Sequence, residues 1–141
     1  MIKIGITGSL SSGKTTASKI ISQKKGPLFS ADRVVRKLYS KKKFKIMLSN
    51  KLDIEIKRNF KNEIKNSIYN NLYNLKKLEK IIHPIVRKEM RVFAKRHYKK
   101  KFLFFEIPLL IESKLQKRFD IIIFIKCSKN LRLKRYLSKG G

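Results

Sequence analysis

The chain has 141 residues and a formal net charge of +28 at pH 7, a length that predicts one domain with its own hydrophobic core. The single cysteine, Cys127, excludes an internal disulfide framework and favours a reducing compartment. No apolar run approaches the ~18 residues of a membrane span, and no secretory leader pattern opens the chain, so we expect a cytoplasmic protein.

The basic charge has two interpretations. A net positive protein attracts phosphate backbones, which suggests a nucleic-acid partner. However, the lysines are spread along the whole chain among many isoleucines and asparagines, as expected if an AT-rich genome biases the surface composition. Neither a zinc-finger spacing nor an aromatic-rich RNA-binding signature accompanies the charge. We therefore favour compositional bias, with some attraction of anionic substrates.

Residues 8–15 carry the most informative motif, a phosphate-binding loop of the form G-x-x-x-x-G-K-[ST]. The loop follows the apolar run Ile2–Ile6 and precedes the helix-like stretch Thr16–Gln23. This placement matters because the motif works only between a strand and a helix.

Each residue type in this loop has a physical role. Gly8 and Gly13 permit backbone angles and close approaches that a β-carbon would block. The loop N–H groups and the helix N-terminus then attract anions. Lys14 is expected to reach the β- and γ-phosphates, and the Thr15 hydroxyl to ligate Mg²⁺. The motif therefore predicts a nucleoside-triphosphate site.

Short apolar runs separated by helical segments predict a doubly wound parallel sheet, an α/β fold with helices on both faces. The four predicted strands are Ile2–Ile6, Pro27–Ser30, Phe102–Phe105 and Phe119–Ile125.

Helical spacing fills the region between the second and third predicted strands. Since a crossover needs only one helix, we interpret residues 41–100 as an insertion that binds something, with a padded crossover as the alternative. One apolar face runs through Ile64, Ile68, Leu72 and Leu75 and continues to His83, where Pro84 is expected to open a new helix at its first turn.

Acidic residues at strand ends distinguish the classes of phosphate-loop protein, because ligands bind at the carboxyl ends of parallel strands. The candidates are Asp32, Glu106 and Glu112. Asp32 can accept or orient the proton of an attacking hydroxyl, or it can cap a helix. Glu106 can bind Mg²⁺ through water or cap a helix, and Arg36 can hold a phosphate or pair with Asp32. For His83, capping or packing is favoured over catalysis.

Four blocks in order resemble dephospho-coenzyme A kinase: Gly5–Thr16, Ser30–Asp32 with Arg36, Leu78–Ile85, and Ile107–Glu112. The phosphate loop is generic, but Ala-Asp, His-Pro and Pro-Leu-Leu-x-Glu together are specific. The resemblance extends from Met1 to about Arg135 and implies a P-loop kinase fold. It also implies transfer of the ATP γ-phosphoryl group to the ribose 3′-hydroxyl of dephospho-coenzyme A, the last step of coenzyme A synthesis.

The resemblance assigns a role to each matching residue. Asp32 and Lys14 would be catalytic, and Thr15 would bind Mg²⁺. ATP would be held by Gly8, Ser11, Ser12, Gly13, Lys14, Thr15, Thr16, Arg132 and Arg135. The acceptor would be held by Asp32, Arg36, His83, Pro108, Leu109 and Glu112.

The resemblance also implies a division of the single domain 1–141. Residues 1–40 and 101–128 would form the nucleotide-binding core, 41–100 the helical acceptor-binding insertion, and 129–141 the start of a lid.

Two features depart from the family pattern. Ser30 stands where the family usually has aspartate, and the chain stops as the lid begins, before a fifth strand and a closing helix. We therefore expect a truncated product or fragment whose rate suffers more than its ATP binding, because lid closure excludes water. Other classes remain open: a nucleoside or nucleotide kinase, a nucleic-acid-binding ATPase, or an inactive remnant that binds ATP.

Overall fold

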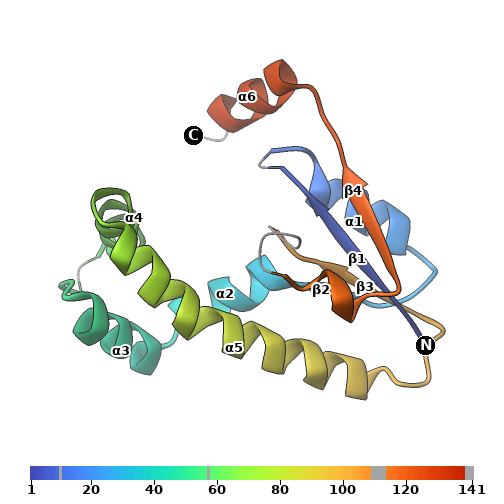
Figure 1. Ribbon diagram of the computed structural model, residues 1–141, viewed down its shortest axis with the longest axis horizontal. Coiled ribbons are helices and arrows are strands. Elements are labelled where there is room, and N and C mark those ends of the chain that lie inside the picture. Colours follow the sequence, from blue (N-terminus) through green and yellow to red (C-terminus); the bar gives the residue numbers. More distant parts are fainter. Residues whose placement is uncertain (10, 57, 109–113, 139–141) are drawn as a thin grey trace. The chain divides into compact units, whose positions relative to one another are not determined.

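The computed structural model describes residues 1–9, 11–56, 58–108 and 114–138. The chain divides into two compact units (Figure 1). The sheet unit comprises Met1–Asp32 and Val92–Gly141, and the helical unit comprises Arg33–Arg91.

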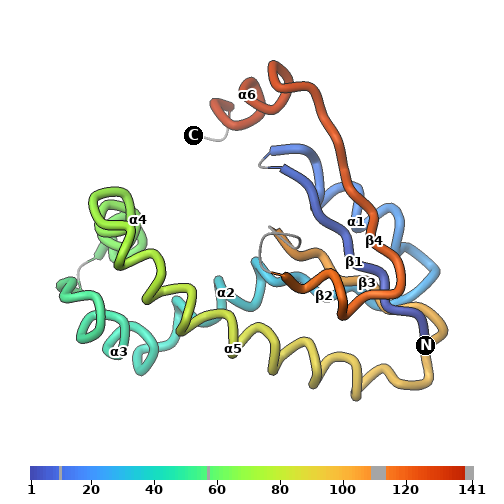
Figure 2. Tube along the Cα trace, in the orientation of Figure 1, coloured from blue at the N-terminus to red at the C-terminus, as the bar shows by residue number. Residues whose placement is uncertain are grey.

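Four parallel strands form the sheet, in the spatial order β2-β3-β1-β4. They are β1 (Ile2–Gly8), β2 (Leu28–Ser30), β3 (Phe102–Glu106) and β4 (Ile121–Ile125). All four predicted strands are confirmed, although the last begins at residue 121 rather than 119, because a short 3₁₀ turn, η1 (Gln116–Arg118), precedes it. Figure 2 shows the strands running side by side, so that their carboxyl ends meet at one edge.

Helix α1 (Lys14–Ser22) covers one face of the sheet, and the end of α5 (Leu72–Arg96) covers the other. The cluster on the first face is Ile4, Ile6 and Phe104, with Ile21 of α1 packed against it. On the second face the ring of Phe93 lies 5.5 Å from that of Phe29 and 5.3 Å from that of Phe105 between centroids. The predicted α/β class with helices on both faces is therefore confirmed.

The helical unit is built on α2 (Ala31–Tyr39), α3 (Lys42–Leu52), α4 (Phe60–Asn70) and most of α5. Their apolar faces enclose a second core made of Leu38, Phe44, Leu48, Leu52, Ile54, Phe60, Ile64 and Leu78. Tyr39 packs edge-on against Phe44 at this core, and burial raises the pKa of its phenol.

The helix boundaries differ from those predicted. Pro84 does not begin a helix but lies inside α5. The break occurs earlier, at Asn71, whose backbone is extended and whose Oδ1 accepts a hydrogen bond from the N–H of Tyr73 at 3.0 Å. An asparagine side chain that bonds the backbone two residues ahead competes with the helix, which explains the new start at Leu72.

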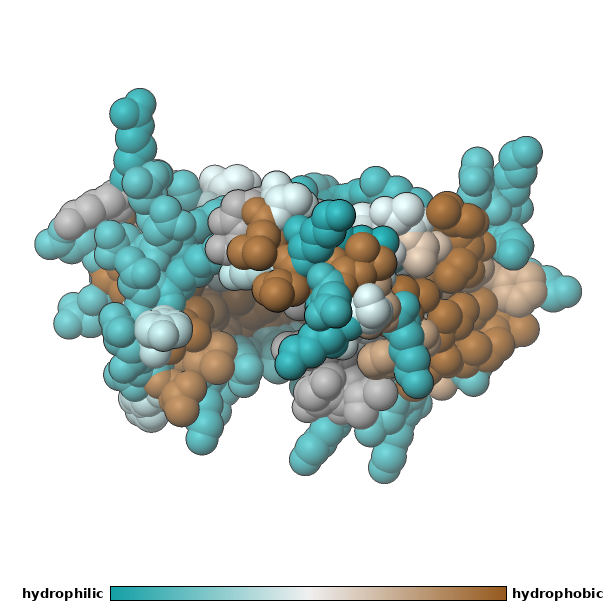
Figure 3. Space-filling view, turned by 90° about the horizontal axis from the view of Figure 1, so that it is seen from above, coloured by the Kyte–Doolittle hydropathy of each residue, from teal (hydrophilic) through white to brown (hydrophobic). Residues whose placement is uncertain are grey.

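Strand β4 and the helix after it, α6 (Lys129–Ser138), leave apolar side chains in solvent. Ile121 and Phe124 are each 47% exposed, and Leu137 is 65% exposed. Figure 3 shows hydrophobic side chains, in brown, gathered toward the right over the sheet unit. Among the described residues, no helix combines the length and the hydropathy that crossing a membrane requires.

Candidate active site

The phosphate loop has the backbone geometry that its two glycines permit. A β-carbon on Gly8 would lie 2.6 Å from the carbonyl oxygen of Ile125 and 2.8 Å from Ser12 Oγ, so a side chain there would collide with its neighbours. Gly13 has a φ of +92°, in the left-handed region that L-residues rarely occupy. This geometry leads directly into α1, which begins at the next residue, Lys14.

Polar groups of the loop converge on the same turn. The Lys14 ammonium donates a hydrogen bond to the Ser9 carbonyl at 3.2 Å, which holds the cation against the loop. The hydroxyl of Ser12 is buried and has no hydrogen-bond partner among the residues that the structure describes. A buried hydroxyl costs free energy unless it is paired, so this donor fits a site that accepts a hydrogen-bonding ligand.

Glu106 connects the third strand to the phosphate loop. It is the last residue of β3 and only 2% exposed, and its Oε1 accepts a hydrogen bond of 2.7 Å from Thr15 Oγ1 in the first turn of α1. The contact follows from strand order, because β3 lies next to β1 and Glu106 is in register with Ile6. A buried carboxylate and a hydroxyl therefore lie together beside the loop.

One arginine side chain, that of Arg135, reaches the loop from α6. Arg135 Nη1 lies 3.1 Å from the point that a β-carbon on Gly13 would occupy, and it donates a hydrogen bond of 3.6 Å to Cys127 Sγ. The Nε of Arg132 is buried without a partner among the described residues. The guanidinium of Arg135 thus adds positive charge at the anion-binding turn. Sequence reasoning missed Cys127 as its partner, since a lone cysteine carries no pattern.

Asp32 lies just beyond the end of β2 and is exposed. Helix α2 begins at Ala31, so Asp32 sits in the first helical turn rather than capping a helix that begins at Arg33. A carboxylate in a first turn is favoured by the helix dipole. Because Ser30 is in register with Glu106, the acids Asp32 and Glu106 belong to the ends of adjacent strands.

Comparison with known proteins gives the loop and its acids a family context. The model of the dephospho-CoA kinase family matches residues 2–141, nearly the whole chain. The chain belongs to the dephospho-CoA kinase family. The dephospho-CoA kinase of Rickettsia typhi is 36% identical over 141 residues, which is all of this chain and 73% of that protein. The dephospho-CoA kinase of Agrobacterium fabrum is 30% identical over 156 residues, again covering all of this chain and 74% of that protein.

Solved structures agree on the fold. The crystal structure of TT1252 from Thermus thermophilus superimposes with a TM-score of 0.81 at 24% identity, over 99% of this chain and 73% of that one. The dephospho-CoA kinase from Campylobacter jejuni gives a TM-score of 0.56 at 20% identity, over 98% of this chain and 95% of that one. Both comparisons support the P-loop kinase architecture expected for the dephospho-CoA kinase family.

The acceptor residues expected from the family are divided between the two units. Arg36 and His83 lie in α2 and α5 of the helical unit, where Arg36 is exposed and His83 is half-buried. Pro108 lies in a turn shortly after β3 in the sheet unit. Leu109 and Glu112 lie outside the described residues. The role of these five residues in acceptor binding stays a prediction.

Proposed function

We propose that this member of the dephospho-CoA kinase family transfers the γ-phosphoryl group of ATP to the ribose 3′-hydroxyl of dephospho-coenzyme A, giving coenzyme A. The observation that carries the proposal is the 2.7 Å contact between Thr15 Oγ1 and the buried carboxylate of Glu106. Phosphoryl transfer by this kind of loop needs a hydroxyl and a carboxylate beside the β- and γ-phosphates, and the contact supplies both.

ATP would bind with its phosphates in the loop, where successive N–H groups and the N-terminus of α1 attract anions. Lys14 would reach the β- and γ-phosphates, and Gly8, Ser11, Gly13 and Thr16 would shape the cradle. The buried, unpartnered Ser12 hydroxyl supports this assignment, since a phosphate oxygen would satisfy it. We also propose that the protein acts in the cytoplasm.

The oxygen atoms beside the loop also fit Mg²⁺, which prefers hydroxyl, carboxylate, water and phosphate oxygens in proteins. Thr15 would ligate the ion directly, and Glu106 would bind it through water. When bound, the ion neutralises charge on the β- and γ-phosphate oxygens. Glu106 meanwhile orients the Thr15 hydroxyl by accepting a hydrogen bond from it, which leaves an oxygen lone pair of Thr15 free for the metal.

The chemical step would form one bond and break one bond. The 3′-oxygen of the acceptor attacks the γ-phosphorus, and the bond to the bridging oxygen of ADP breaks. Asp32 orients the hydroxyl and receives its proton, and the positive charges of Lys14, Arg132 and Arg135 stabilise the transferring group. Arg36, His83, Pro108, Leu109 and Glu112 would hold the acceptor.

The test is ADP formation from Mg·ATP, with and without dephospho-coenzyme A, combined with the mass of the acceptor. The proposal predicts ADP that depends on the acceptor and an acceptor that gains one phosphoryl group. Equal ADP formation with and without dephospho-coenzyme A would contradict the proposal.

The variant Asp32→Asn separates the chemical role of this carboxylate from ATP binding. Loss of a general base typically reduces the rate about 10²- to 10⁴-fold. We expect a loss in this range with unchanged ATP affinity. An unchanged rate would remove Asp32 from the mechanism without affecting the proposed acceptor.

A further inference from the structure

The helical unit has a surface groove between α3 and α5 that none of the roles above uses. Its volume is about 510 Å³. The described residues that line it are Met47, Lys51, Lys77, Lys80, Ile81 and Ile85. Every lining side chain is therefore either apolar or a lysine.

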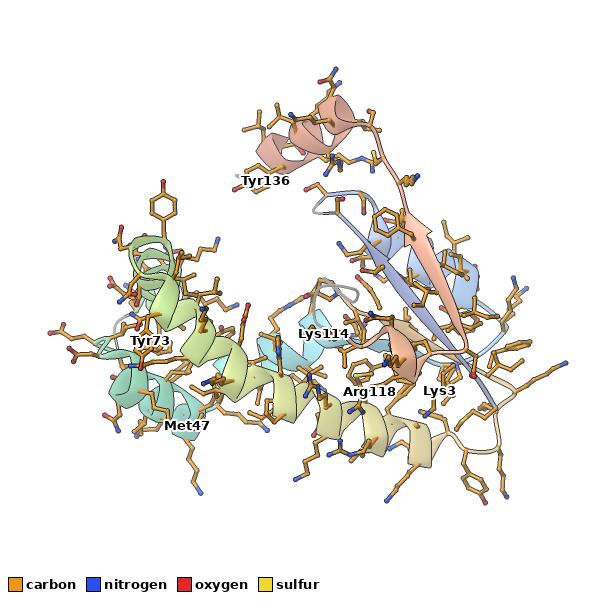
Figure 4. All side chains as sticks on the ribbon, viewed as in Figure 1. Lys3, Met47, Tyr73, Lys114, Arg118 and Tyr136 are labelled. Carbon is orange, nitrogen blue, oxygen red and sulfur yellow. The ribbon has the colours of Figure 1, made fainter. Side chains whose placement is uncertain are left out.

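The floor of the groove is apolar. Met47 of α3 and Ile81 and Ile85 of α5 are each half-buried and pack against the core of the helical unit. Figure 4 labels Met47 on α3. Since these three side chains keep part of their surface in solvent, a ligand that covers them gains hydrophobic free energy.

The rim carries positive charge on both sides, with Lys51 on α3 and Lys77 and Lys80 on α5. The ammonium of Lys77 lies 4.6 Å from the ring centroid of Tyr73 and donates to the carbonyl oxygen of Lys51 at 3.5 Å, which holds this cation at the rim. Lys51 and Lys80 are exposed. An occupant must therefore be apolar in the middle and negatively charged along both edges.

The groove lies on a different side of α5 from His83. At about 100° per residue, Ile81 and Ile85 are separated by about 40° around the helix axis, and His83 lies about 180° from their midpoint. The groove is therefore distinct from the helix face that carries the proposed acceptor residue.

We propose that this groove docks an acidic amphipathic helix from a partner polypeptide. A third helix laid between two helices places one apolar stripe on the floor and its flanking positions over both rims. Glutamates or aspartates at those flanking positions would pair with Lys51 and Lys80. A bilayer surface offers the same charge, but it is flat and would span the hollow without covering Met47.

The three methionines of the chain provide a direct test. Labelling the methionine methyl groups gives one NMR signal for each of the three residues. Met47 lies in the groove, Met90 is buried, and Met1 is 56% exposed and belongs to the sheet unit. The probe is a synthetic helical peptide with leucine at every third or fourth position and glutamates on both flanks. We expect saturable shifts of Met47, with Met1 and Met90 unmoved.

Specificity is tested with a scrambled peptide of the same composition and with two variants. Charge reversal at the rim, Lys51→Glu with Lys80→Glu, should weaken binding about tenfold or more, since like charges would then face each other. Lys65→Glu, on an exposed part of α4 outside the groove, is the matched control and should change affinity less than about twofold. An unmoved Met90 signal verifies that each variant is folded.

Several outcomes would overturn the proposal. If the scrambled peptide bound as tightly as the amphipathic peptide, binding would reflect only charge attraction to a basic protein. If Lys65→Glu weakened peptide binding as much as the rim variant does, binding would likewise be general charge attraction. Saturable Met47 shifts with decanoate or with anionic vesicles, but not with the helical peptide, would assign the groove to a small amphiphile or to a membrane instead.

Discussion

The side chain of Glu106 combines deep burial with a polar partner, since it is 2% exposed and accepts a hydrogen bond from Thr15. A carboxylate in such a place is costly unless it is paired or meets a cation. The hydroxyl of Thr15 offsets part of this cost, and a divalent cation beside the loop would offset more. The position of Glu106 therefore fits a group that serves Mg·ATP rather than the stability of the sheet.

Replacing Glu106 with glutamine tests this role at nearly constant volume. Glutamine can still accept a hydrogen bond from Thr15, but it brings no charge. We therefore expect the rate of phosphoryl transfer to fall about 10- to 100-fold and the Mg²⁺ concentration needed for half the maximal rate to rise. The measurement is the rate against Mg²⁺ concentration. Glu79→Gln, on the exposed face of α5, is the matched control. Equal Mg²⁺ dependence of the Glu106 variant and wild type would refute the metal role.

Gly13 is the second residue whose identity the loop requires. Its φ of +92° opposes a β-carbon, and Arg135 Nη1, 3.1 Å from where that carbon would lie, would have to shift slightly. We expect Gly13→Ala to lower the free energy of unfolding by about 1–2 kcal/mol, the usual cost of a left-handed conformation for an L-residue, and to weaken ATP binding. Thermal unfolding with and without ATP measures both effects. A variant as stable as wild type would show that the loop tolerates another conformation.

At the scale of elements, α5 continues through Pro84, where sequence reasoning expects a new helix. Proline lacks the N–H that would bond the carbonyl four residues earlier, here that of Lys80. The helix persists because buried side chains lie on both sides of the proline, Leu78 before it and Val86 and Met90 after it. Packing therefore overrides the local preference.

Pro84 leaves the interior of α5 one backbone hydrogen bond short. Pro84→Ala restores the missing hydrogen bond and a strong helix former, so we expect the free energy of unfolding to rise by about 1–3 kcal/mol. Chemical denaturation measures the change. A destabilised variant would contradict the account and would show that the proline itself sets the shape of α5.

Strand β4 lies at the edge of the sheet and presents an uninterrupted apolar sequence, with Ile121 and Phe124 each 47% exposed. Exposed apolar edge strands pair with other chains, and charged residues suppress such pairing. We therefore expect Phe124→Lys to reduce self-association at high protein concentration. Light scattering against concentration measures this. If the variant and wild type scattered light equally, self-association would not involve the exposed edge of β4.

At the scale of the whole molecule, apolar patterning predicts the sheet well. Runs such as Phe102–Phe105 identify strands because both faces of a parallel sheet are covered by helices. The same patterning fails at Asn71, because the apolar spacing from Ile64 to Leu75 stays helical across the break. The hydrogen bond that the Asn71 side chain accepts from the N–H of Tyr73 reveals where one helix ends and the next begins.

The candidate site is predictable in its parts but not in its contacts. The motif identifies Lys14 and Thr15 from local sequence alone. The bond between Thr15 and Glu106 joins residues 91 positions apart and depends on strand order and register, which no local pattern gives. The groove beside Met47 depends likewise on how α3 packs against α5.

The most direct test of the proposed function is a competition between acceptors under limiting Mg·ATP. Dephospho-coenzyme A, AMP and single-stranded RNA are supplied together, and the products are identified by mass and by phosphorus NMR. The proposed function predicts that the transferred phosphoryl group is found on the ribose of dephospho-coenzyme A, with one ADP formed per product. Phosphorylated AMP, or ADP formation that follows the RNA concentration, would contradict it.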